Sequence, residues 1–193
     1  MRLLSGIDTV NYGKLFSDLL VRAIRHEERE LKKAMRRGSD QSVKTVGDYY
    51  ESWLQVPLLK AAWAKPKFPE LKWEQKRVDL CFFADKRIVA DFELKPFFPV
   101  PSRNYANIVE DFGKQYERAK CDRSTQHYVV LIPKGELEKI DEWIVNTLVP
   151  RVESEFKGIA IVDISPKNHG IRLNTTSYAS VRTFRISANR SPR

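Results

Sequence analysis

The sequence lacks several features that would assign a protein to a class at once. It contains no run of about 20 apolar residues that could form a transmembrane helix, and residues 1–6 open no apolar stretch typical of a secretory signal. Its two cysteines, Cys81 and Cys121, form no paired motif. These absences favour a cytoplasmic protein with reduced thiols and argue against a membrane span, a disulfide framework or a zinc site.

Two common catalytic motifs are also missing from the sequence. It has neither a glycine-rich phosphate-binding loop nor a Gly-x-Ser-x-Gly element, which argues against a P-loop nucleotidase and a serine hydrolase. The histidines, His26, His127 and His169, are scattered without metal-ligand spacing. We therefore expect structural or surface positions for them.

What is present is the composition of a globular protein. Apolar residues make up 42% of the 193 residues and charged residues 31%, which is enough apolar material for one substantial core. The length favours a single domain. We expect its core at about residues 47–164, with a helix at 14–37 and a basic tail at 165–193 as additions.

Positive charge exceeds negative charge along this chain. Lysine and arginine number 34 against 25 aspartates and glutamates, which gives a formal net charge of +9. The excess is uneven, because the stretch 165–193 has six cations and no acid. Such a surface attracts polyanions, so a nucleic acid is the leading partner. Charge alone does not separate this interpretation from a role in solubility.

Hydrophobic periodicity predicts an α/β protein with a mixed sheet of about five strands and helices on both faces. Pro57 should kink or divide the second helix, and Pro96 should end the second strand. The expected helices are 14–37, 47–63, 105–119 and 135–155, and the expected strands are 77–83, 87–95, 128–132 and 159–162, with a final hairpin around 171–173 and 181–186.

The strongest local signal is a tight hairpin that turns at residues 84–86. In its second strand, Asp91, Glu93 and Lys95 alternate with apolar residues, so the three charged groups share one face. The hairpin brings Asp79 of the first strand back beside Glu93. Two carboxylates and a lysine therefore converge, and crowded carboxylates favour a neutralising cation such as Mg²⁺.

This chemistry suits phosphodiester cleavage. A metal ion would polarise a phosphoryl oxygen and activate a water molecule, and Lys95 would offset charge in the transition state. The alternative is a structural salt bridge in which Lys95 pairs with Glu93 or Asp91. We expect Asp91 itself to support the site from behind or to pair with Arg87.

The arrangement of Asp79 with Glu93-Leu94-Lys95 on successive strands resembles the PD-(D/E)XK nuclease superfamily. The resemblance implies a restriction-endonuclease-like αβββαβ core and hydrolysis of DNA that depends on Mg²⁺ or Mn²⁺. It also implies metal binding by Asp79, Glu93 and the Leu94 backbone carbonyl, with Glu51 on the preceding helix as a further acidic residue. Asp111 and either Lys114 or Gln115 would face the site from the next helix.

The sequence departs from that family at two places. Val78 stands where the motif's name has proline, a position without a chemical role. Gln115 is followed four residues later by Ala119, so the Gln-x-x-x-Tyr pattern of one exonuclease-like branch is missing.

The sequence thus predicts a metal-dependent DNA endonuclease active in defence, repair or mobile-element processing. Cutting both strands would require a homodimer or a second binding event, and the first helix and basic tail would clamp the phosphate backbone. The alternative is a non-catalytic nucleic-acid-binding module, or a subunit of a larger complex, with the same fold. The residues predicted to contact nucleic acid are Lys114, Gln115, Arg172, Arg182 and Arg185.

Overall fold

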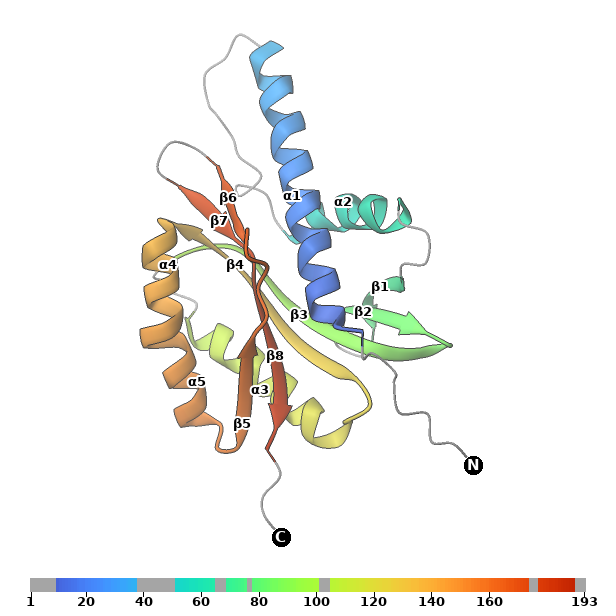
Figure 1. The fold of residues 1–193 in the computed structure, drawn as a ribbon, viewed down its shortest axis with the longest axis vertical. Helices are drawn as coiled ribbons and strands as arrows, with labels where there is room; N and C mark the ends of the chain where they lie inside the picture. The colour runs from blue at the N-terminus through green and yellow to red at the C-terminus, as the bar shows by residue number, and fades with distance from the viewer. Residues whose placement is uncertain are drawn as a thin grey trace.

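The computed structural model describes residues 10–37, 51–64, 69–75, 78–100, 105–173 and 177–189 of the chain. These residues form an α/β protein in which helices cover both faces of a curled, mixed sheet (Figure 1). Part of the second expected helix, at 47–50, and the last two cations of the basic tail, Arg190 and Arg193, lie outside the described residues.

The helices lie close to where hydrophobic periodicity predicts them. They are α1 (Tyr12–Arg37), α2 (Glu51–Trp63), α3 (Tyr105–Cys121) and a continuous stretch made of α4 (Leu137–Trp143), the π-helical turn η2 (Ile144–Leu148) and α5 (Val149–Glu155). Pro57 was expected to kink or divide the second helix; it does not divide it, because α2 continues through Pro57. In the part of the chain that the structure describes, no helix combines the length and the apolar character needed to span a membrane.

The strands form one sheet with a single parallel pair among the described residues. The strands are β1 (Glu70–Gln75), β2 (Val78–Ala84), β3 (Arg87–Pro99), β4 (Gln126–Gly135), β5 (Ile159–Asp163), β6 (Gly170–Arg172), β7 (Tyr178–Ser180) and β8 (Arg182–Ala188). Their order is β1-β2-β3-β4-β7-β6, and β8 pairs with both β4 and β5. β1 was not expected: Leu71 and Trp73 alternate with polar residues as in a half-buried strand, but the segment is short and rich in Glu, Lys and Gln, which have low strand propensity.

The predicted hairpin is confirmed as β2 and β3, joined by Asp85 and Lys86. Both turn residues have positive φ values, 50° and 63°, which is the geometry of the two-residue turn that best matches strand twist. Pro96 does not end β3, contrary to expectation. The register with β4 shifts between Lys95 and Phe98, where Phe97 has a φ of 46°. After this irregularity β3 pairs with β4 again and continues to Pro99.

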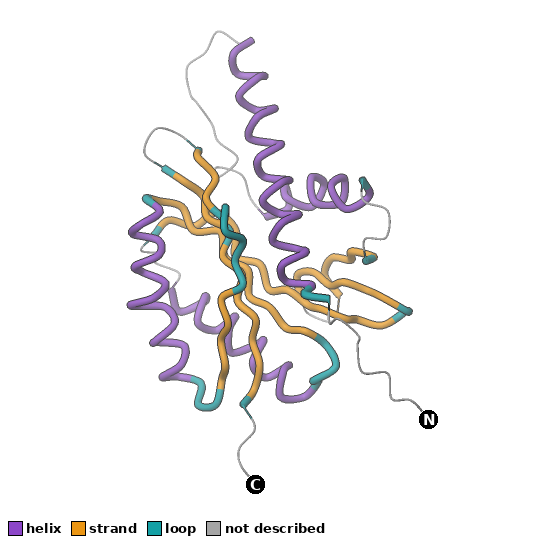
Figure 2. The backbone as a smooth tube through the Cα atoms, in the orientation of Figure 1, coloured by secondary structure: helices purple, strands orange, loops and turns teal. Residues whose placement is uncertain are grey.

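Two apolar cores lie on opposite faces of the sheet, as the tube in Figure 2 shows through the placement of its helices. α1 and α2 pack on one face, against Phe92 of β3 and Tyr128 of β4. α3 and the α4–α5 stretch pack on the other, against Val129 and Leu131 of β4. β3 and β4 therefore run through the middle of the molecule with a helix-covered surface on each side.

Candidate functional site

The alternation of β3 separates its apolar and charged side chains, as predicted. Ala90, Phe92 and Leu94 are buried in the core beneath α1. The side chains of Asp91, Glu93 and Lys95 fall on the other face, where they meet residues of α3. The crossover helix between the parallel strands β3 and β4 thus covers the charged side of β3 and forms one wall of a polar site.

Asp79 reaches this site through the β2–β3 hairpin. The backbone pairing of the hairpin includes Leu80 and Phe92. Just beyond that pair, the side chain of Asp79 makes the next hydrogen bond to β3. Its Oδ2 accepts a hydrogen bond from the backbone N–H of Leu94 at 2.7 Å. The Asp79 carboxylate therefore lies against the backbone segment that carries Glu93 and Lys95, which is the convergence that the sequence predicts.

α3 contributes four polar residues at helical spacing, Asp111, Lys114, Gln115 and Arg118. Lys95 Nζ lies 3.2 Å from Asp111 Oδ2, and Arg118 Nη1 lies 3.3 Å from Glu93 Oε2. Lys114 Nζ lies 2.9 Å from the other oxygen of Asp111. Lys95 therefore pairs with α3, and the expected alternative of a bridge to Glu93 or Asp91 is not the arrangement found.

Burial and crowding raise the pKa of both predicted metal-binding carboxyls. Removal from water, together with the negative charges of Asp79 and Asp111, raises the pKa of Glu93 to about 7 despite the nearby Arg118. Removal from water also raises the pKa of Asp79, with a further contribution from Asp111, although the Leu94 N–H and two lysines oppose the change. The site thus holds carboxyl groups that favour a further positive charge.

A second layer of polar groups lies behind Glu93. With its amide oriented to satisfy both ends, Gln115 donates to Asp91 Oδ1 at 3.0 Å and accepts from Arg118 Nη1 at 3.1 Å and the Glu93 N–H at 3.3 Å. Asp91 also lies 2.9 Å from His127 Nδ1. The predicted supporting position of Asp91 agrees with this geometry, and its partner is His127 of β4 instead of Arg87.

His127 is a buried histidine in this layer, and both of its ring nitrogens face oxygen atoms. Its Nδ1 faces the Asp91 carboxylate and its Nε2 lies 2.7 Å from the backbone oxygen of Asp122. Both neighbours are hydrogen-bond acceptors, so the protonated ring can donate to both of them. Burial alone would lower the pKa of His127, but the hydrogen bonds and charges of Asp91 and Asp122 outweigh it and raise the pKa.

The remaining predicted residues fall in different surroundings. Glu51 begins α2, and its side chain lies outside the described part of the chain. Lys114 is exposed at the site. Gln115 is fully buried, so the prediction that it contacts nucleic acid is wrong and its contacts lie inside the protein. Arg182 is also corrected, because it is 9% exposed and pairs with Asp141 and Asp163.

Arg172 and Arg185 are exposed, on β6 and β8. Sequence reasoning assigned no role to Arg118, which the geometry places at the site, and expected His127 only in a structural or surface position, where the structure buries it against Asp91. A signal for Arg118 was present, because it follows Asp111 at i+7 and so shares a helix face with Asp111 and Lys114.

The donor set can be tested against the demands of a metal ion. Among the described residues, no three Asp, Glu, His or Cys side chains group closely enough to form a metal site by themselves. Mg²⁺, however, keeps several water ligands and is commonly bound through one or two carboxylates. Asp79, Glu93 and the Leu94 carbonyl, with water, match that requirement in ligand type and charge.

A scan against protein-family models and searches of curated proteins and solved structures find no match to this chain.

Proposed function

We propose that the chain is a metal-dependent nuclease that hydrolyses phosphodiester bonds in nucleic acid, acting as a DNA endonuclease. The observation that carries the proposal is the meeting of Asp79, Glu93 and Lys95 on the α3 side of the β2–β3 hairpin. The order α2, β1 to β3, α3 and β4, with β4 parallel to β3, supports a restriction-endonuclease-like core of the αβββαβ type. This is the element order that the PD-(D/E)XK resemblance implies.

In this proposal Asp79, Glu93 and the Leu94 carbonyl hold Mg²⁺ or Mn²⁺. The ion, when bound, supplies polarisation of a phosphoryl oxygen and a water molecule of lowered pKa. The elevated pKa of Glu93, about 7, supports the assignment because crowded carboxyls of this kind gain from a neighbouring cation. Metal binding would therefore favour the ionised forms of both Asp79 and Glu93.

Lys95 contributes positive charge where negative charge develops on the phosphate. Its side chain is 33% exposed, while that of its partner Asp111 is 5% exposed, so Asp111 holds the ammonium group from the protein side. Lys114 binds the other oxygen of Asp111. The two lysines are thereby oriented before substrate arrives, which is how fixed charges lower a barrier at small reorganisation cost.

The alternative function is nucleic-acid binding without hydrolysis. It is favoured by the partners that Glu93 and Lys95 have, Arg118 and Asp111 respectively. In that case the cluster is an ion-pair layer that fixes α3 to the sheet, and the basic charge of the chain provides the binding.

Cleavage assays separate the two functions. Supercoiled plasmid and labelled single-stranded and branched DNA would be incubated with Mg²⁺, Mn²⁺ or EDTA, using wild type, Lys95→Ala and the control Lys139→Ala, an exposed lysine of α4. The nuclease proposal expects metal-dependent cleavage by wild type and the control that falls at least about 100-fold in Lys95→Ala, the usual scale for a lost transition-state charge. Salt-sensitive binding without cleavage of any substrate would establish the alternative.

A melting experiment tests the metal site without activity. Mg²⁺ at 100 times its dissociation constant stabilises a protein by about 2.7 kcal/mol, or roughly 5–11 °C for a domain of this size. We expect this increase for wild type and not for Asp79→Asn. Equal increases in both proteins would remove Asp79 from the metal site.

A further inference from the structure

A groove adjoins the candidate site at the start of β3. It has a volume of about 590 Å³ and is bounded by the β2–β3 turn, the first residues of β3, the end of α3 and the loop that leads into β4. Three of its lining residues, Asp91, Arg118 and His127, also belong to the site. The groove and the site are therefore continuous.

The groove carries positive charge at a defined distance from Glu93. Lys86 and Arg87 line it and are exposed, and within the described part of the chain no carboxylate pairs with either. Arg87 precedes Glu93 by six residues on β3, which corresponds to about 20 Å at about 3.3 Å per residue. One strand of a duplex carries a phosphate every 3.4 Å or so along its axis, so several phosphates span this distance.

The two carboxylates of the groove have partners inside the protein. Asp91 lies 2.9 Å from His127 Nδ1 and accepts from Gln115. Asp122 accepts hydrogen bonds from Ser124 and Thr125, which lower its pKa to about 2. Neither carboxylate forms an ion pair with Lys86 or Arg87, so the outer end of the groove remains positively charged.

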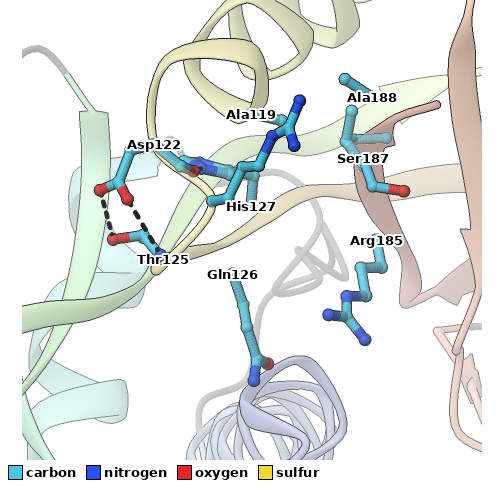
Figure 3. Close-up of a pocket in the computed structure, with 10 residues that line it drawn as sticks. Ala119, Asp122, Thr125, Gln126, His127, Arg185, Ser187 and Ala188 are labelled. Atoms are coloured by element: carbon cyan, nitrogen blue, oxygen red, sulfur yellow. Dashed lines mark hydrogen bonds between the residues drawn. The ribbon is translucent and has the colours of Figure 1, made fainter. Parts of the chain in front are cut away.

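The wall of the groove is built before any ligand binds. Thr125 Oγ1 hydrogen-bonds to Asp122 at 2.8 Å and lies 3.2 Å from the Ile88 backbone oxygen of β3. Figure 3 shows the Asp122–Thr125 hydrogen bonds at the edge of a smaller neighbouring pocket, which Arg185 also lines. A preordered loop lowers the entropy lost when a ligand is bound.

We propose that this groove binds the phosphate backbone of the nucleic-acid strand that is cut, with Lys86 and Arg87 contacting phosphates on one side of the scissile bond and Arg118 lying between them and the metal site. The inference rests on the proposed function for the identity of the strand. It deepens that function by assigning the path of the substrate, which neither the charge pattern nor the hairpin motif specifies.

The test is the salt dependence of binding. Lys86→Gln/Arg87→Gln would be compared with wild type and Lys139→Gln by fluorescence anisotropy of a labelled 20-nucleotide single strand and its duplex, in EDTA, at several salt concentrations. Loss of two phosphate contacts reduces the slope of log K against log salt by about 1.4 for the single strand or about 1.8 for the duplex. We expect this reduction in the double variant, with an unchanged slope in Lys139→Gln and unchanged melting temperatures.

Parallel cleavage assays distinguish failure of the groove from failure of the proposed function. Cleavage by wild type that is lost in Lys95→Ala, together with a wild-type salt slope in the double variant, would overturn the groove and leave the nuclease intact. A reduced slope without cleavage of any substrate would support the groove as a nucleic-acid surface and overturn the nuclease. Absence of binding by wild type would overturn both.

Discussion

Replacing Glu93 with glutamine is expected to stabilise the protein at alkaline pH. The pKa of Glu93 is about 7 in the folded protein against an ordinary value of 4.5, so between these values the folded state binds one proton more than the unfolded state. Stability therefore falls as pH rises, by about 1.4 kcal/mol per pH unit. Over the 2.5 units between the two values the loss is about 3 kcal/mol, and the Glu93→Gln variant avoids it because its amide does not ionise.

The measurement is urea unfolding followed by tryptophan fluorescence from pH 4.5 to pH 8, in EDTA. We expect Glu93→Gln and wild type to have similar stability at pH 4.5, and the variant to be about 2–3 kcal/mol more stable at pH 8. The glutamine oxygen can still accept from Arg118, so little is lost there. Glu153→Gln, at an exposed glutamate of α5, is the matched control and should follow the wild-type profile.

Two results would refute this reasoning. A difference between Glu93→Gln and wild type that does not change with pH would show that burial and the charges of Asp79 and Asp111 do not act on Glu93 as inferred. Lower stability of the variant at pH 8 would show that the ionised carboxylate and Arg118 form a net stabilising pair. Mg²⁺ provides a further check, because it should stabilise wild type more than the variant and so reduce the gap.

Two further predictions concern the layers behind the site. His127→Gln should lower the free energy of unfolding by about 3–5 kcal/mol, because it leaves the buried Asp91 without its positively charged partner. The pKa of His127 is raised in the folded protein. The stability that His127 provides is therefore complete below about pH 6.5 and is lost as pH rises through the higher folded pKa. Denaturation of both proteins between pH 5 and pH 9 checks this, and a constant deficit would count against the ion pair. Gly113→Ala should cost about 1–3 kcal/mol, because its Cβ would lie 2.5 Å from the Phe156 ring; a melting temperature equal to that of wild type would show that α3 and α5 adjust freely.

The fold was predictable where local chemistry decides the structure. Two β-branched and aromatic segments flank a short polar turn, so the β2–β3 hairpin was evident from the sequence, although Lys86 is an unusual residue at a positive φ. β1 was missed because its alternating Leu71 and Trp73 stand in a short segment of residues with low strand propensity, and its position depends on pairing with β2. The extension of β3 past Pro96 depends on β4, a strand that lies more distant in sequence.

The site was predictable to the extent that strand alternation determines it. Asp79, Glu93 and Lys95 were identified because period-two alternation and a hairpin turn place them together. Asp111, which pairs with Lys95, was expected to face the site only through the family resemblance. Arg118 and His127 were not expected there, because they reach the site through the packing of α3 and the parallel pairing of β4. Tertiary contacts of this kind are only weakly predictable from a single sequence.

β4 is a central strand of the sheet, and its burial and pairing affect how the chain folds as it is synthesised. Seven consecutive residues, His127–Pro133, are buried, and one long edge of the strand is covered by β8 and β7, which follow about fifty residues later in the chain. Until those strands arrive, a nascent chain presents an apolar strand with a row of unpaired backbone groups, which is a template for association with other chains. Chaperone protection during synthesis is therefore most valuable in the interval between β4 and β8.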